Sequence, residues 1–388
     1  MAISSRVVFL GAGIHSNLAH GIEKNVVQLQ QLPEPPVLYR DFLNDEKLPY
    51  KRLAKEPSSD KPAGLIDISV EVAEQALSEA GISDTQRSNM ALFIGSSSFD
   101  ISLTEAEFER ELAENSSTAL PLRDPSFSKL ADQLVDRLAI GGEDYSFNTA
   151  CTASANALIA ATRQIQAGWI DHALILGIEL FNNVTALGFQ GLGLLTSSVM
   201  KPFDENRDGL VLGEGVSALV IGRQPEGGDE YFALVGAASL SDTHSISAAN
   251  PDGSSIAQVM QQALDSANIN AEQVQGVKVH GTASLSNDES EAAGLHHIFS
   301  KMPPLSAIKP YLGHTLGACG LNELILYYRA IEAGFLPATP GISQCPGLLN
   351  IRLNQNYTRP KGGFYMLNYF GFGGNNSSLI IHCSADPS

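Results

Sequence analysis

The chain has 388 residues, of which 44% are hydrophobic and 17% charged, and its formal net charge at pH 7 is −18. A chain this acidic repels nucleic acid and anionic membrane surfaces, so both are excluded as main partners. It has no apolar run long enough to cross a bilayer and no signal-peptide pattern, and its four cysteines lack disulfide or metal-site spacing, so a cytoplasmic protein is expected.

Strand and helix signals alternate along the first 238 residues of the chain. Residues 7–10 predict a strand with a glycine turn at 11–13, and residues 28–61, with five prolines, predict an irregular excursion. The other signals predict helices over 66–80, 101–138 (interrupted) and 152–167, strands over 89–95, 145–148, 172–180, 216–221 and 231–238, and a loop over 200–214. Alternation at this spacing is typical of an α/β fold with buried sheets.

The pattern then returns in the second half of the chain. Residues 74–83 are similar to residues 261–270, and each segment precedes a short apolar strand. A further likeness of 166–170 to 332–336 places Cys151 opposite Gly317, each at a helix start. Because three elements recur in one order, we predict an internal duplication, rather than a chance likeness of amphipathic helices. The two halves are expected to be residues 1–228 and 229–388.

Cys151 lies where a predicted strand gives way to a predicted helix, among small residues. The unpaired N–H groups and the positive dipole end of a helix start favour the thiolate form of a cysteine. Small neighbours also leave room for a substrate. The alternative is an inert core cysteine, since free cysteine is among the most buried residue types.

Three further stretches combine glycine with polar or aromatic residues. They are 279–289 with His280, 309–320 with Lys309 and His314, and 368–376 with Phe370, Phe372 and Gly373. Glycine lets the backbone approach a ligand or another segment closely. Taken singly, each signal also has an ordinary explanation: a hydrogen-bonded structural histidine, a surface lysine, close helix packing or a core phenylalanine.

Together, these stretches resemble the β-ketoacyl-[acyl carrier protein] synthases of the thiolase superfamily, over residues 7–381. The matching motifs are Thr149-Ala-Cys-Thr152, the stretch 203–215, His280-Gly-Thr282 with Asn287, Asp288 and Glu291 after it, Lys309 with Gly313, His314, Gly317, Ala318 and Glu323, and the stretch 370–376. The resemblance implies a thiolase-like α/β fold, in which duplicated strand–helix halves form a layered α-β-α-β-α architecture. It is weakest over 28–61.

The chain departs from the family pattern at a few positions. They are Ala283-Ser284 where Gly-Thr is usual, Cys319 for alanine, Leu210 for an aromatic residue and Asn375 for threonine. These departures leave the catalytic set complete but bear on the acyl pocket.

The resemblance implies a decarboxylating Claisen condensation that extends a fatty acid, polyketide or polyene chain. Cys151 would accept the acyl group, and His280 and His314 would donate N–H bonds to the malonyl thioester carbonyl. Lys309, with Glu323 nearby, would orient the histidines. No metal and no cofactor is expected.

The resemblance also assigns supporting roles. Asp288 would support the site, and the backbone N–H groups of Cys151 and Phe372 would form an oxyanion hole. Phe370, Phe372 and Gly373 would gate the pocket.

Two other functions remain open. A degradative thiolase would carry a second cysteine in the C-terminal glycine motif, and residues 370–376 contain none. A chain-length-factor-like partner subunit of a heterodimeric ketosynthase would have little or no activity of its own. Many such subunits lack the nucleophile, whereas Cys151, His280 and His314 are all present here.

The expected partners are an acyl carrier protein, with acyl and malonyl groups on its phosphopantetheine, and a second ketosynthase-like chain. Basic residues that an acidic partner could use are Arg163, Lys201, Arg207, Lys301 and Lys309. The family forms dimers through the strand after the nucleophile helix, which is 172–180 here and is apolar on both faces. Because an exposed apolar edge needs a cover, we expect a homodimer or a heterodimer through this strand.

Overall fold

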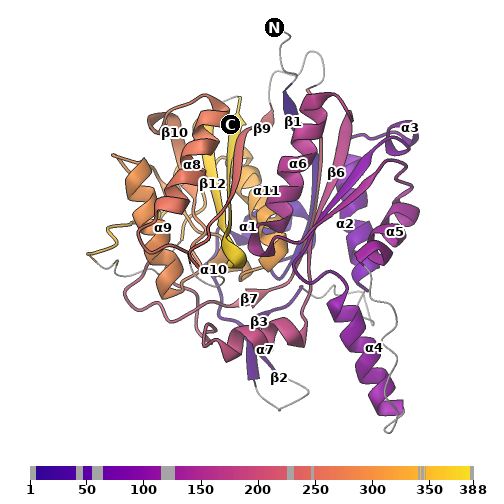
Figure 1. Ribbon diagram of the computed structural model, residues 1–388, viewed down its shortest axis with the longest axis horizontal. Helices are drawn as coiled ribbons and strands as arrows, with labels where there is room; N and C mark the ends of the chain where they lie inside the picture. Colours follow the sequence, from indigo (N-terminus) through magenta and orange to yellow (C-terminus); the bar gives the residue numbers. More distant parts are fainter. Residues whose placement is uncertain are drawn as a thin grey trace.

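Figure 1 shows a computed structural model of the chain, which describes residues 6–40, 47–54, 64–114, 127–224, 231–245, 249–339, 341, 345 and 347–384. The elements of the first half are β1 (Val7–Ser16), α1 (Ile22–Gln28), β2 (Val37–Arg40), β3 (Lys47–Lys51), α2 (Leu65–Glu79), α3 (Asp84–Arg87), β4 (Ala91–Gly95), α4 (Ile101–Glu114), α5 (Phe127–Leu138), β5 (Asp144–Phe147), η1 (Ala150–Thr152), α6 (Ala153–Ala167), β6 (His172–Glu179), α7 (Asn183–Gly191), β7 (Leu212–Gly213) and β8 (Gly215–Arg223). Those of the second half are β9 (Phe232–Ser241), α8 (Ser254–Ala267), η2 (Ala271–Gln273), β10 (Val274–Lys278), α9 (Leu285–Ile298), β11 (Leu305–Ser306), α10 (Lys309–Leu312), η3 (Leu316–Ala318), α11 (Cys319–Glu332), β12 (Gly363–Phe370), η4 (Phe372–Gly374) and β13 (Asn375–Cys383).

The main sheet consists of two groups of five strands with the same internal order. One group runs β5-β4-β6-β8-β1 and the other runs β11-β10-β12-β13-β9. When the five strands of each group are numbered in chain order, both groups have the spatial order 3-2-4-5-1. One residue pair, Val8 opposite Ala233, joins β1 to β9 and thereby the two groups. This recurrence confirms the predicted internal duplication. The predicted boundary after residue 228 falls within 225–230, outside the described residues, and stays a prediction.

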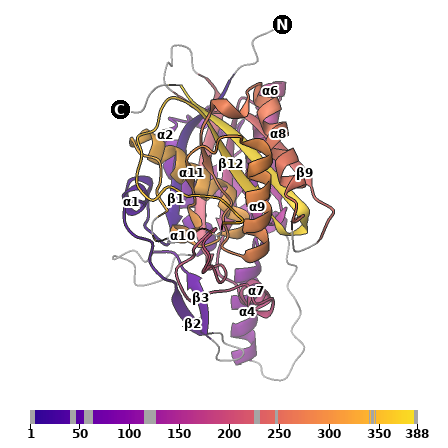
Figure 2. The same ribbon diagram turned by 90° about the vertical axis from the view of Figure 1, so that its left-hand side faces the viewer.

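Helices cover both faces of each group of strands (Figures 1 and 2). Helix α2 packs on β1 and β8 and against α5, α8 packs on β9 and β13 and against α9, and α6 and α11 pack against each other between the groups. The buried apolar side chains form three clusters that match these layers, represented by Val72, Val259 and Leu158. The predicted α-β-α-β-α layering is confirmed. In the described part of the chain, the helices are too short or too polar to cross a membrane.

Strand β6 is apolar on both faces, as predicted, but it is not an edge strand. It pairs with β4 on one side and with β8 on the other. Leu174 and Leu176 join the cluster beneath α2, while Ala173 and Ile175 join the cluster around α6. Helices on both faces therefore explain the composition of β6, and the prediction that residues 172–180 form the dimer edge is wrong. At that end of the sheet the edge is β5, which among the described strands pairs with β4 alone.

The N-terminal segment contains more regular structure than its sequence predicted. Gly11 and Gly13 lie inside β1 and not in a turn, and a Cβ at these positions would lie 2.3 Å from Ala76 O and 2.1 Å from Val72 O. Glycine here lets α2 cross the strand closely. Within the predicted irregular excursion, β2 and β3 form a small sheet with β7, whereas 41–46 and 55–61 lie outside the described residues.

Candidate active site

Cys151 follows a sharp backbone corner after β5. The preceding Ala150 has φ 50°, and the turn η1 then leads into α6. In the second half, Leu316 has φ 41° and precedes Gly317 in η3, at the start of α11. The two corners pack together, and a Cβ at Gly320 would lie 2.4 Å from a backbone nitrogen of α6. The duplication therefore brings two equivalent helix starts face to face, with Cys151 at the first and Gly317 at the equivalent position of the second.

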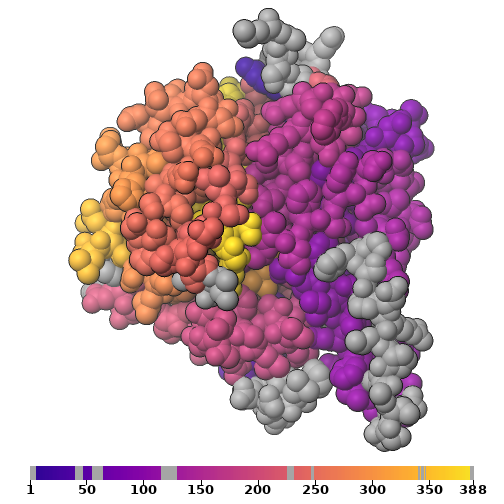
Figure 3. All heavy atoms as spheres, viewed as in Figure 1, coloured from indigo at the N-terminus to yellow at the C-terminus, as the bar shows by residue number. Residues whose placement is uncertain are grey.

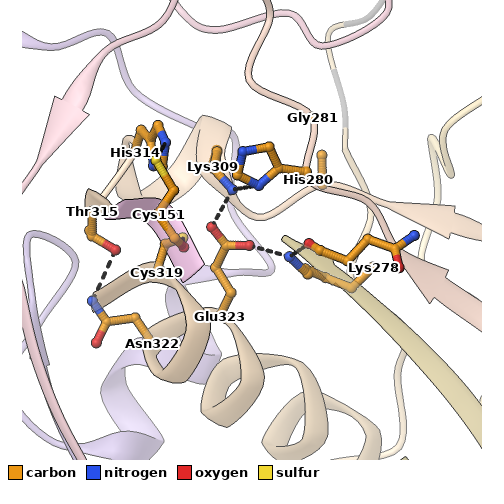
Figure 4. Close-up of polar contacts among 12 residues, drawn as sticks. Cys151, Lys278, His280, Gly281, Lys309, His314, Thr315, Cys319, Asn322 and Glu323 are labelled. Carbon is orange, nitrogen blue, oxygen red and sulfur yellow. Dashed lines mark hydrogen bonds and ion pairs between the residues drawn. The ribbon is translucent and has the colours of Figure 1, made fainter. Parts of the chain in front are cut away.

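Two histidines of the second half lie on the other side of this junction, and one of them contacts the thiol. His314 Nε2 lies 3.1 Å from Cys151 Sγ, and the rings of His280 and His314 are 5.4 Å apart and nearly perpendicular (Figure 4). The backbone N–H of His314 donates to Val211 O at 2.6 Å, which holds this loop against the first half. Figure 3 shows the two halves side by side, with yellow atoms of the C-terminal part of the chain at the surface between them.

Hydrogen bonds determine which ring nitrogen of each histidine carries the proton. The N–H of Leu316 donates to His314 Nδ1 at 3.2 Å, and Lys309 Nζ lies 3.1 Å from His280 Nδ1. A backbone N–H and an ammonium group can only donate, so both Nδ1 atoms accept and both Nε2 atoms carry hydrogen. The site thus presents two Nε2–H donors beside one thiol.

Burial and nearby positive charges keep the histidines neutral. Burial lowers the pKa of His280 and of His314 well below its ordinary value, and the positive charges of Lys309 and Lys278 lower both further. Burial acts to lower the pKa of Lys309 too, but the Glu323 carboxylate, 2.7 Å from Nζ, raises that pKa above its usual value. Lys309 is therefore a buried cationic donor and not a surface lysine.

The thiol itself is protonated at neutral pH. Burial raises the pKa of Cys151 to about 11, although the charge of Lys309 and the N–H groups of Phe372 and of Cys151 itself act in the opposite direction. The N–H groups at the helix start do favour the thiolate, as predicted, but desolvation of the thiolate outweighs them. The same two N–H groups remain close to any negative charge that develops at this sulfur.

Two buried carboxylates hold the loop that carries His280. Glu291 accepts a hydrogen bond of 2.7 Å from the His280 N–H, and burial raises the pKa of Glu291 to about 7. Asp288 accepts from Phe203 N at 2.7 Å and from Ala283 N at 3.2 Å, and burial raises its pKa to about 6. Asp288 therefore joins the 203–215 stretch to the histidine loop, while Glu291 holds the histidine backbone directly.

A cavity of about 50 Å³ opens onto the thiol. Its walls include Cys151, both histidines, Phe370 and Phe372. The Phe370 ring lies 5.7 Å from the His280 ring, and the Phe372 ring stacks on Phe189 of α7 at 5.5 Å. Gly373 does not line the cavity; with φ 79° it forms the turn that carries Phe372. No group of three or more His, Cys, Asp or Glu side chains that could hold a metal occurs in the described part of the chain.

Comparisons with known proteins agree with this arrangement. Residues 60–226 match the N-terminal domain of β-ketoacyl synthases, and residues 231–343 match the C-terminal domain. The chain belongs to the β-ketoacyl synthase family. A 3-oxoacyl-[acyl-carrier-protein] synthase 2 of Vibrio harveyi is 29% identical over 329 residues, which is 79% of this chain and 79% of that protein.

Solved ketosynthase structures share the fold over nearly the whole chain. The ishigamide ketosynthase/chain length factor is 25% identical with a TM-score of 0.82, covering 97% of this chain and 99% of that chain. A ketosynthase in complex with its chain length factor from Xenorhabdus doucetiae is 23% identical with a TM-score of 0.81, covering 98% of each chain.

Some of the residues that depart from the β-ketoacyl synthase pattern line the cavity, and one is buried behind the nucleophile. Leu210 and Ser284 line the cavity, so they shape the space beside the thiol. Cys319 is fully buried behind the nucleophile, where its Sγ donates to Cys151 O at 3.0 Å. Of the basic residues considered for an acidic partner, Lys309 and Arg207 are buried and cannot belong to a surface patch.

Sequence reasoning missed two residues of this β-ketoacyl synthase site. Phe189 carries no motif, and only the fold brings α7 against Phe372. Lys278 is fully buried at the end of β10, two residues before His280. A lysine between Val277 and Val279 was the available signal, since lysine is rarely buried without a partner.

Proposed function

We propose that this β-ketoacyl synthase extends an acyl chain by decarboxylating Claisen condensation between a Cys151-bound acyl group and malonyl-[acyl carrier protein]. One observation carries the proposal: His314 Nε2–H lies 3.1 Å from the Cys151 sulfur, with the His280 ring 5.4 Å from that of His314. A nucleophile beside two neutral donors suits acyl transfer followed by stabilisation of an enolate oxygen.

The reaction has two balanced steps. First, the Cys151 sulfur attacks the acyl thioester on the carrier, and the thiol proton ends on the departing carrier thiol. Second, the malonyl group loses carbon dioxide, and the electrons of the broken C–C bond form an enolate whose oxygen accepts the Nε2–H bonds of His280 and His314. The enolate carbon then attacks the acyl-cysteine, which leaves a β-ketoacyl carrier thioester and the Cys151 thiolate. The thiolate takes up one proton from solvent to restore the free thiol.

The remaining residues support these steps. Lys309 donates to His280 Nδ1 and, anchored by Glu323, keeps the other nitrogen of that ring as a donor. The N–H groups of Cys151 and Phe372 are assigned to the oxyanion of the acyl-transfer step. A cavity of about 50 Å³ holds only about one or two water molecules. Loading of an acyl chain therefore requires the Phe372 turn to move, which is the gating role proposed for Phe370, Phe372 and Gly373.

The proposed partners are an acyl carrier protein and a second ketosynthase-like chain. Among the structural neighbours, one is a type II PKS acyl-carrier protein in complex with its ketosynthase, and another is a ketosynthase in complex with its chain length factor. Among the strands that the structure describes, β5 pairs with β4 alone, and Asp144 and Ser146 on it are exposed. An open strand edge is a template for pairing with another strand, so we assign the dimer contact to β5.

Intact-mass spectrometry tests the function. Incubation with acyl-[acyl carrier protein] should add one acyl mass to the wild type and none to Cys151→Ala, while Cys319→Ala should load normally. Labelling that persists in Cys151→Ala would contradict the assignment.

The same loading experiment also distinguishes the two candidate functions of this chain, an active enzyme and a partner subunit. Loading and condensation by the chain alone, as a dimer in light scattering, support a homodimeric enzyme. Activity that appears only with a co-expressed synthase-like chain supports the chain-length-factor reading. Cys151, His280 and His314 are all present, with His314 in contact with the Cys151 sulfur and His280 in contact with Lys309, and this favours the enzyme.

A further inference from the structure

Lys278 is a second buried lysine in the network behind the histidines. Its Nζ donates to Glu323 Oε2 at 2.6 Å and to Asn368 O at 2.7 Å, and it lies 3.7 Å from the centre of the Tyr369 ring. Glu323 uses its other oxygen, Oε1, for Lys309 at 2.7 Å (Figure 4). One carboxylate is thus shared by two cations, and none of the three side chains is more than 1% exposed.

The sharing gives each lysine its own oxygen of Glu323. Lys278 donates to Oε2 and Lys309 to Oε1, and Lys309 directs a further N–H to His280 Nδ1 at 3.1 Å. The charge balance matters as well. A single lysine and Glu323 would form a neutral pair, whereas two lysines and one carboxylate carry a net charge of +1 next to both imidazoles. A buried positive charge disfavours a second positive charge nearby.

We propose that Lys278 is a positioning residue of the β-ketoacyl synthase site: it divides the oxygens of Glu323 between two lysines, and its charge keeps His280 and His314 as neutral Nε2–H donors. The inference rests on the proposed function of these histidines in decarboxylation. Burial lowers the pKa of Lys278, and Glu323 acts against this shift. The charge of Lys278 in turn contributes to the lowered pKa of both histidines.

Other titratable groups also face this network. They are the thiols of Cys151 and Cys319, the carboxyls of Glu291, Asp288 and Glu179, and the phenol of Tyr369. Burial raises the pKa of each of them, so at neutral pH the thiols and the phenol are uncharged, whereas Glu291, with a pKa of about 7, titrates near neutrality. A test must therefore observe the histidines themselves.

The test is histidine NMR on the full chain labelled at the imidazole Cε1. Lys278→Met removes both the charge and the hydrogen bonds of the lysine, whereas Lys278→Gln keeps donors for Glu323 and for Asn368 O without the charge. Both variants should raise the pKa of His280 and His314. A shift in Lys278→Met alone, or in neither variant, would overturn the role of the charge. Lys51→Met is the matched control.

The control removes another buried lysine, whose Nζ donates to the Pro310 and Tyr311 carbonyls and not to Glu323. Lys51→Met should leave the histidine pKa values unchanged, and a shift as large as that of the Lys278 variants would refute a specific role. If the Lys278 variants do not fold, NMR of lysine Cε in the wild type decides. The proposal requires Lys278 to be an ammonium group at pH 7, and a neutral amine there would sink it.

An activity measurement links the inference to catalysis. Neutral imidazole is the active form, so a higher histidine pKa moves the acid limb of malonyl-carrier decarboxylation to higher pH in both Lys278 variants. The NMR readout needs no substrate. Shifted histidines in a chain whose wild type shows no decarboxylation would therefore refute the proposed function alone, and unshifted histidines in an active enzyme would refute this inference alone.

Discussion

Alkylation of Cys151 by iodoacetamide measures how strongly burial suppresses the thiolate. With a pKa of about 11, only roughly one thiol in 10³ is ionised at pH 8, whereas an ordinary cysteine with a pKa of about 8.5 is roughly one-quarter ionised. The more basic thiolate of Cys151 is also about tenfold more nucleophilic, and this offsets part of the difference in ionised fraction. Cys151 should therefore react about 20-fold more slowly than N-acetylcysteine at pH 8.

The pH dependence and one substitution sharpen the prediction. The alkylation rate should rise about tenfold per pH unit from pH 7 to about pH 10, because the thiolate fraction rises by that factor below the pKa. Lys309→Met should slow the reaction at each pH, since the charge of Lys309 lowers the pKa of Cys151. Cys319→Ala is the control, because it changes the surroundings of the Cys151 sulfur without removing a charge.

Peptide mass spectrometry after timed labelling gives the rate at Cys151 separately from that at the other three cysteines. A rate that levels off below about pH 9 would show that the thiolate already forms near neutrality, and would refute the dominance of burial. A Lys309→Met protein that reacts as fast as the wild type would refute the electrostatic role of that lysine.

Three other predictions follow from the site and its packing. His280→Ala and His314→Ala should each lower malonyl-carrier decarboxylation on the order of 10²–10³-fold, because each removes one oxyanion donor; near-normal carbon dioxide release would argue against both roles. Phe372→Ala should change the acyl loading rate, as should removal of its stacking partner on α7, and unaltered loading in both would indicate a structural role only. Gly320→Ala should destabilise the fold by about 1–3 kcal/mol or more in thermal unfolding, because its Cβ meets backbone of α6, while Gly188→Ala, with no atom within 4 Å, should not.

The strand and helix order was predictable because each element has its own hydrophobic period. The same signal misled at β6, where apolar residues on both faces indicate cover by helices, not an open edge. Glycines 11 and 13 were misplaced for a similar reason, since a close approach of α2 depends on tertiary packing.

The catalytic set could be named from motifs, but its electrostatics could not. The pKa of Cys151 depends on desolvation by residues distant in sequence, which a local helix-start rule ignores. The pairing of Lys278 with Glu323 spans 45 residues and arises only when β10 and α11 meet.

The two facing corners at Cys151 and Gly317 show that the internal symmetry of this molecule is necessarily imperfect. A Cβ at Gly317 would lie 2.2 Å from the backbone nitrogen of Ser97, which belongs to the first half. Position 317 therefore has no space for a side chain, so the second corner cannot carry a nucleophile where the first carries Cys151. The close approach of the two halves thus leaves room for one nucleophile at these two equivalent positions.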